Sequence, residues 1–70
     1  MGLSGSVQAQ RTFAARKALK AARDTAIYAS QLAMLAAITP DRQAQVAEAT
    51  EYTLAAIHGM GRAINLGSTK

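Results

Sequence analysis

The chain is poor in the residues that usually cross-link or fill a small fold. Its 70 residues include no cysteine, no tryptophan, one proline, one histidine and three aromatic side chains. Without cysteine there is no disulfide framework, and a single histidine does not make an ordinary zinc site. Because large side chains are few, two helices of this size have little material for a core. Small folds with that deficit usually oligomerise.

Long apolar runs are missing as well. Residues 1–6 are rich in glycine and serine, and no apolar run of signal-peptide length follows them. The most apolar stretch, residues 26–38, has 13 residues and is too short to span a bilayer. We therefore expect no transmembrane segment and synthesis in the cytoplasm without a signal peptide. A virion or a secreted filament stays open as the final location.

Alanine is abundant, with 17 of the 70 positions. No glycine or proline interrupts residues 7–38, where the helix-favouring residues Ala, Gln, Arg, Lys and Leu dominate. The only proline, Pro40, follows Thr39, a good N-cap, and precedes Asp41, which suits the positive end of a helix dipole. These signals predict an all-α fold: a two-helix hairpin of long alanine-rich helices joined at Thr39-Pro40.

We predict a single small helical domain over residues 1–70. Its predicted parts are a flexible lead-in at 1–6, a first helix at 7–38, a second helix at 40–65 and a tail at 66–70. Ser6 is the expected first N-cap, and Gly67 the expected helix stop. One kinked rod is the alternative, because proline is tolerated in the first turn of a helix.

Apolar and small residues recur every seven positions in both predicted helices. In the first helix the two series are Val7, Ala14, Ala21, Tyr28, Leu35 and Arg11, Ala18, Thr25, Leu32. In the second they are Val46, Thr53, Met60, then Ala49, Ala56, Ala63, then Thr50, Ile57, Ile64. This spacing is typical of closely packed helices, so we interpret these series as the faces that the two helices present to each other. Antiparallel counting places Met60 and Ile64 near Ala18 and Ala21, and Tyr28 near Ala49 and Thr53.

The end of the first predicted helix is apolar nearly all round. Between residues 26 and 38 only Ser30 and Gln31 are polar. Such a helix is buried on more than one side, whereas a single partner helix covers one side. We therefore predict a homo-oligomer in which Ile27, Met34 or Ile38 meets the alanine-rich surface of another copy.

Positive charge gathers early in the chain. Five of the eight basic residues lie at positions 11–23, and the four acidic residues, Asp24, Asp41, Glu48 and Glu51, all follow. On a helix Arg16, Lys17, Lys20 and Arg23 share a face, which makes them candidates to contact nucleic-acid phosphates or acidic headgroups. A merely solvated face is the alternative. We expect no aromatic residue among these basic residues, and so no stacking platform for single strands.

The sequence offers no catalytic constellation. It has no carboxylate pair in a plausible pocket, no activated nucleophile and no core large enough to hold a cleft, so we expect no enzyme, no cofactor and no metal site. His58 is expected to be a surface or interface residue. Gly59 and Gly61 are expected to mark a bend or a close approach of helices.

These expectations favour a non-enzymatic structural subunit. The Pro40-Asp41 turn between two alanine-rich helices resembles, in architecture, the subunits of secretion needles, pili and phage virions. The chain departs from conjugative pilins in lacking their strong bilayer-spanning segments. The resemblance implies other copies of the chain, and other assembly proteins, as partners. The alternatives are a small basic nucleic-acid-associated protein and a cationic membrane-active peptide.

Overall fold

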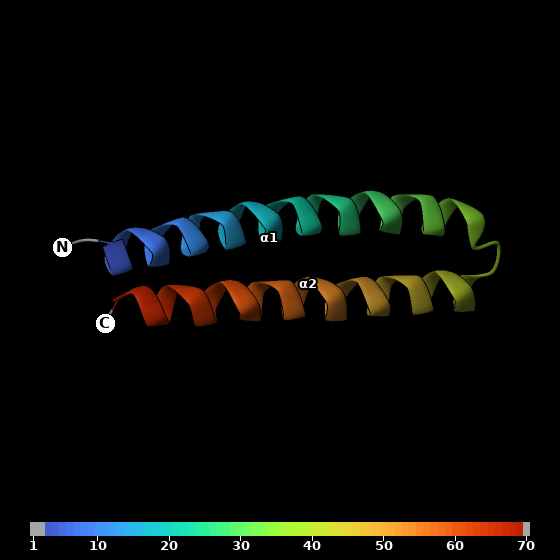
Figure 1. Cartoon of the computed structure of the whole chain (residues 1–70). Helices are drawn as coiled ribbons and strands as arrows, with labels where there is room; N and C mark the ends of the chain where they lie inside the picture. The colour runs from blue at the N-terminus through green and yellow to red at the C-terminus, as the bar shows by residue number, and fades with distance from the viewer. Residues whose placement is uncertain (1–2, 70) are drawn as a thin grey trace.

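The computed structural model describes the backbone of residues 3–69 and the side chains of residues 7–65. It contains two α-helices, α1 at Leu3–Ala36 and α2 at Pro40–Thr69. The helices run antiparallel along their lengths, and the first turn of α1 and the last turn of α2 lie at the same end of the molecule (Figure 1). The predicted all-α hairpin is therefore confirmed, and the kinked rod is excluded.

The turn between the helices is held by local hydrogen bonds. The Thr39 hydroxyl accepts a 3.2 Å hydrogen bond from the backbone N–H of Arg42, and the Thr39 carbonyl accepts one from the N–H of Gln43 at 2.9 Å. The Gln43 side-chain amide donates to the carbonyl of Ala37, just past the end of α1, at 3.1 Å. Thr39 is thus the predicted N-cap and Pro40 the first helical residue, because an N-cap oxygen satisfies a donor that the first turn leaves free.

The outer ends of the helices differ from the prediction. α1 begins at Leu3, so Ser6 lies inside the helix, and it ends at Ala36, two residues before Ile38. α2 continues past Asn65 and through Gly67 to Thr69. A glycine costs a helix only about 1 kcal/mol, and it stops one mainly by adopting positive φ, which no glycine in the described residues does. Residues 1, 2 and 70 of the predicted lead-in and tail lie outside the described residues.

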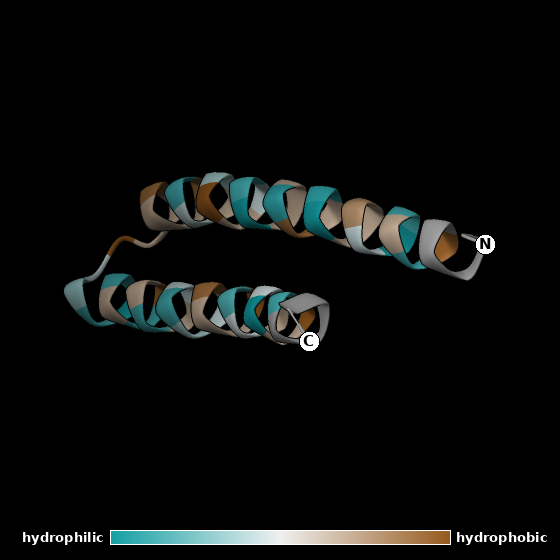
Figure 2. Ribbon diagram, turned by 90° about the vertical axis from the view of Figure 1, so that its left-hand side faces the viewer, coloured by the Kyte–Doolittle hydropathy of each residue, from teal (hydrophilic) through white to brown (hydrophobic). Residues whose placement is uncertain are grey.

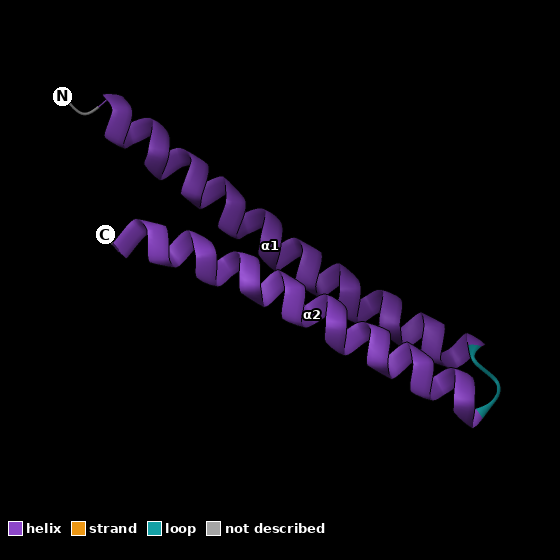
Figure 3. Cartoon of the chain, turned by 90° about the horizontal axis from the view of Figure 1, so that it is seen from below, coloured by secondary structure: helices purple, strands orange, loops and turns teal. Residues whose placement is uncertain are grey.

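The contact between the helices is lined mainly by small residues. Its half-buried side chains are Thr12, Ala15, Leu19, Ala26, Ser30 and Met34 on α1, Ala37 just past its end, and Val46, Thr50, Leu54, Ile57, Gly61 and Ile64 on α2. They recur at intervals of about three, four or seven residues, the spacing of one helix face. Small residues at a contact let two helix axes approach closely. The helices separate gradually toward their outer ends (Figure 3).

The predicted contact face of α1 is wrong, whereas the predicted level of pairing agrees with the Ser30–Thr50 and Arg16–Asn65 hydrogen bonds. Every member of the series that begins at Val7 is exposed, as is every member of the series that begins at Arg11. On α2 the series of Thr50, Ile57 and Ile64 is half-buried as predicted, but of the other two series only Val46 is. Two apolar stripes run along α1, and periodicity alone cannot tell which of them meets α2.

No side chain in residues 7–65 is buried. Apolar and polar residues alternate along both helices (Figure 2). The hairpin is two helices wide and one helix thick, with Cα extents of 59 × 18 × 9 Å. Two helices side by side therefore leave part of every apolar side chain in contact with water.

Candidate functional site

A groove with a basic rim lies between the outer halves of the two helices. It has a volume of about 230 Å³ and is lined by Leu19, Lys20 and Arg23 of α1 and by Leu54, Ile57, His58, Gly61, Arg62 and Asn65 of α2. Leucine and isoleucine side chains are half-buried between the helices beneath it. Four of its lining residues carry basic side chains, and they come from both helices.

Only two of the four predicted anion-binding residues line the groove. Lys20 and Arg23 line the groove. Arg16 lies one turn before Lys20, and its Nη2 donates a 2.6 Å hydrogen bond to Oδ1 of Asn65. Lys17 instead holds its Nζ over the ring of Phe13, 5.8 Å from the centroid. The expectation of no aromatic residue among the basic ones is therefore wrong, because Phe13 lies one helical turn before Lys17 and pairs with it.

The charge pattern of the first helix does not reveal the half of the groove that α2 contributes. His58 and Arg62 are four residues apart and so lie on one face of α2, beside Lys20 and Arg23. A signal was available, because antiparallel counting from the turn brings residues 58–62 level with residues 19–23. His58 is exposed at the rim, as expected of a surface residue.

Few negative charges approach the groove. The Asp24 carboxylate lies 4.0 Å from Nζ of Lys20, one helical turn away, with side chains 65% and 78% exposed. Such an exposed pair is weak and is screened by salt. Glu48 and Glu51 line a separate depression on α2 with Ala44, Gln45 and Ala47. The groove is therefore an electropositive region that its own helices neutralise only in part.

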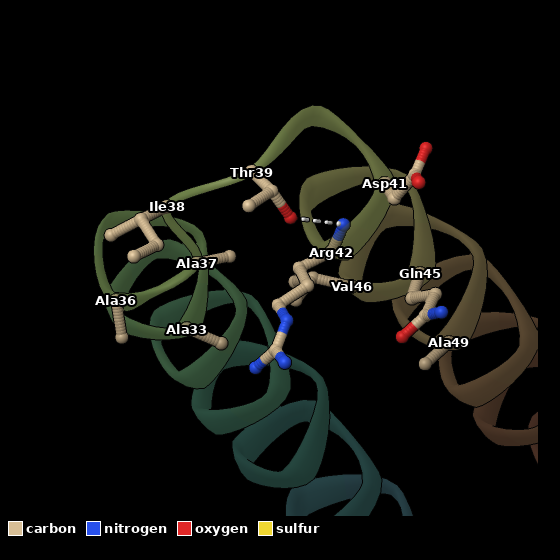
Figure 4. Close-up of a pocket in the computed structure, with 10 residues that line it drawn as sticks. All are labelled: Ala33, Ala36, Ala37, Ile38, Thr39, Asp41, Arg42, Gln45, Val46 and Ala49. Carbon is tan, nitrogen blue, oxygen red and sulfur yellow. Dashed lines mark hydrogen bonds between the residues drawn. The ribbon is translucent and has the colours of Figure 1, made fainter.

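The three residues predicted to contact other copies lie in different surroundings. Ile27 is 37% exposed and Met34 is half-buried, both at the edge of the contact with α2. Ile38 is 85% exposed in the turn, beyond the end of α1. It lines a depression of about 770 Å³ together with Ala33, Arg42 and other residues near the turn (Figure 4). The structure does not bring the three together.

Alanine dominates the surface beside the turn. The depression near Ile38 and a second one of about 290 Å³ share Ala33, Val46 and Ala49, so they are continuous. The second is also lined by Ala26, Ala29 and Thr53. Together they form a shallow, mainly apolar trough between the helices.

Gly61 lines the basic groove but marks no close helix approach. A Cβ built at Gly59 or at Gly61 meets no other group within 4 Å. The expected close approach is therefore wrong for the hairpin itself.

Among the described residues no three His, Asp or Glu side chains gather as metal ligands. Within the same part of the chain, neither helix combines the length and the apolar character needed to cross a membrane. No protein-family model, curated protein or solved structure matches this chain.

Proposed function

We propose that this protein is a non-enzymatic structural subunit of a homo-oligomeric assembly, a ring or a filament, in which copies pack through the back of α1. The observation that carries the proposal is a second apolar stripe on α1, which the hairpin leaves uncovered. We call it the back stripe: Val7, Ala14, Ala18, Ala21, Tyr28, Leu32 and Leu35.

The back stripe faces away from α2 because of helix geometry. Ala26 and Ser30 face α2, and Tyr28 is two residues from each, which is about 200° around a helix. Tyr28 is 62% exposed and Leu35 is 81% exposed. A contiguous exposed apolar surface usually marks a contact with another molecule. A helix with apolar stripes on two sides is suited to pack against two neighbours.

The back stripe is complementary to itself in the antiparallel direction. Its outer half carries Ala14 and Ala21, and its half near the turn carries Tyr28 and Leu35. Two copies related by a two-fold axis near residues 24 and 25 would set Leu35 against Ala14, and Tyr28 against Ala21. Large side chains would then fill the space over small ones at these two levels, as close helix packing requires. A two-fold contact of this kind is isologous and closes as a dimer.

A second contact is needed to extend a dimer into a larger assembly. The two edges of the α1–α2 contact differ: Ile27 lies on one edge and Ala29, about 200° away, on the other. The edge with Ala29 and Ala33 borders the alanine trough. Hairpins stacked with Ile27 and Met34 of one copy against the trough of the next would make a head-to-tail contact, which yields a ring or a filament.

Cysteine cross-linking tests the pairing directly, because the native chain has no cysteine. We expect the double variant Ala21→Cys/Tyr28→Cys to form a covalent dimer under mild oxidation, because the antiparallel pair brings position 21 of one copy beside position 28 of the other. Ala21→Cys alone and Tyr28→Cys alone should cross-link poorly. A control variant with one cysteine on the far side of α2, Tyr52→Cys, should stay uncoupled.

Sedimentation and particle images of the wild type complete the test. Efficient cross-linking of Tyr28→Cys alone would indicate parallel pairing and contradict the proposed contact. A wild type that stays monomeric at high concentration would contradict the assembly itself. Salt-dependent DNA binding or leakage of dye from vesicles by that monomer would then favour the nucleic-acid-associated protein or the membrane-active peptide.

A further inference from the structure

We propose that the groove between the outer halves of α1 and α2 binds a single phosphate group, as inorganic phosphate or as a phosphate monoester. The groove is built by both helices, and the proposal does not depend on how copies assemble. Its positive side chains are Lys20, Arg23 and Arg62, and the imidazole of His58 adds a fourth nitrogen group on the rim.

The charge of the groove suits a dianion. Lys20, Arg23 and Arg62 supply three positive charges, Arg16 adds a fourth beside the lining residue Asn65, and Asp24, which lies 4.0 Å from Lys20, removes one, so the net charge is 4 − 1 = +3. A phosphate monoester carries a charge of about −1.5 to −2 at neutral pH and presents three strong acceptor oxygens. A carboxylate carries half that charge and would leave part of the groove's positive charge unpaired.

The donors suit a tetrahedral anion. The two arginines come from opposite sides of the groove, and each guanidinium has a planar fork of donors that can bind phosphate through two hydrogen bonds. Lys20 adds a compact charge on the same side as Arg23. The volume of about 230 Å³ is several times the ~30 Å³ that one water occupies in the liquid, so a phosphate fits with water around it.

The basic surface is too short to follow a nucleic-acid backbone. Along the same edge of α1, Lys20 is followed at seven-residue intervals by Ile27 and Met34, which are apolar. On α2 the carboxylates of Glu48 and Glu51 lie on the turn side of His58. A polyanion needs basic contacts repeated along its strand, because each strand presents a phosphate about every 3.4 Å of the helix axis. Toward the turn the basic residues therefore end at the groove, and on the other side Lys17 is turned onto Phe13, so the groove favours one phosphate.

Equilibrium dialysis of the protein against labelled inorganic phosphate at low ionic strength tests the site. The protein can be assembled or dissociated in this experiment. We expect saturable binding of one phosphate per chain. Arg23→Gln/Arg62→Gln should weaken it at least about tenfold, because each hydrogen bond to a charged group contributes roughly that factor. The matched control Lys17→Gln/Arg42→Gln removes the same charge outside the groove and should change the affinity less than about twofold. Asp24→Asn should strengthen binding, because it removes the carboxylate that lies 4.0 Å from Lys20.

Vesicle binding distinguishes a lipid phosphate from a soluble phosphate as the ligand. If the group belongs to a lipid, vesicles containing phosphatidic acid should bind the wild type, phosphatidylcholine vesicles should not, and millimolar inorganic phosphate should compete. Binding of free phosphate without vesicle binding assigns the site to a soluble anion.

Three outcomes would overturn the proposal. The first is equal loss of phosphate binding in the groove variant and in its matched control, which would reduce the effect to net charge. The second is duplex DNA binding with a salt dependence that indicates many phosphates, without a saturable phosphate site. The third is a groove variant that loses assembly while the wild type binds no phosphate, which would mean that carboxylates of another copy occupy the groove. Failure of the cysteine pairs to cross-link would contradict the proposed assembly without affecting this site.

Discussion

The hydroxyl oxygens of Ser30 and Thr50 lie 2.9 Å apart across the contact between α1 and α2. The Thr50 hydroxyl is also 2.8 Å from the carbonyl oxygen of Val46. A carbonyl can only accept, and Thr50 has a single hydroxyl proton, so Thr50 donates to Val46 and the Ser30 hydroxyl donates to Thr50. This bond joins the helices in the half of their contact nearer the turn.

Removal of the Thr50 hydroxyl should therefore destabilise the hairpin more than removal of the Thr53 hydroxyl. Thr53 donates to the carbonyl of Ala49 at 2.9 Å, within its own helix. We expect Thr50→Val to lower the free energy of unfolding by about 1 kcal/mol more than Thr53→Val, because only Thr50 also leaves a partner on α1 unsatisfied. Thermal melting should show a difference of about 4–8 °C. Equal melting temperatures would mean that the Ser30–Thr50 bond contributes nothing.

Loss of the N-cap should destabilise the start of α2. Thr39→Ala removes the oxygen that accepts from the N–H of Arg42, and we expect it to cost about 0.5–2 kcal/mol of stability. Thr39→Ser keeps that oxygen and should stay close to the wild type. Chemical denaturation monitored by circular dichroism compares the two. If both variants lose the same stability, the threonine methyl group matters and the cap does not.

Alanine at Gly59 should stabilise the protein. Gly59 is exposed in α2, and a Cβ there meets no other group within 4 Å. We expect Gly59→Ala to add about 1 kcal/mol, because glycine is that much less favourable than alanine inside a helix. The melting temperature should rise, and the assembly state should not change. A lower melting temperature or a smaller assembly would show that Gly59 lies at a close contact between copies.

Charge on the back stripe should break the proposed assembly, whereas charge on the back of α2 should not. Leu35 and Tyr52 are similarly exposed, at 81% and 79%, but Leu35 lies on the back stripe and Tyr52 on α2. We expect Leu35→Asp to release smaller species in sedimentation experiments and to melt earlier, because folding and association are coupled. Tyr52→Asp is the matched control. Release of small species by Tyr52→Asp alone would move the contact to α2.

The helices and the turn could be predicted because local interactions determine them. Thr39, Pro40 and the N–H of Arg42 are within four residues of one another, so the capping signal is complete in the sequence. Alanine-rich segments form helices wherever no stop signal intervenes. The predicted outer bounds failed at Ser6 and Gly67, because neither residue stops a helix unless the chain leaves helical geometry there.

The candidate site could be predicted only in part. Lys20 and Arg23 follow from the charge pattern of α1, whereas His58 and Arg62 join them only when the two helices lie side by side. Lys17 lies over the Phe13 ring, and Arg16 donates a hydrogen bond to Asn65. Both contacts depend on side-chain placement that no spacing rule describes.

The sequence by itself determined two long helices, their reversal at Thr39-Pro40 and the presence of apolar stripes on α1. Only the tertiary structure decided how α1 is rotated about its own axis. Both stripes of α1 are apolar, so hydrophobicity does not choose between them. The stripe with Ala15, Ala26 and Ser30 faces α2, because small side chains let the helices approach and Ser30 finds a partner in Thr50. That rotation leaves Tyr28 and Leu35 on the outside and places Lys20 and Arg23 beside Arg62.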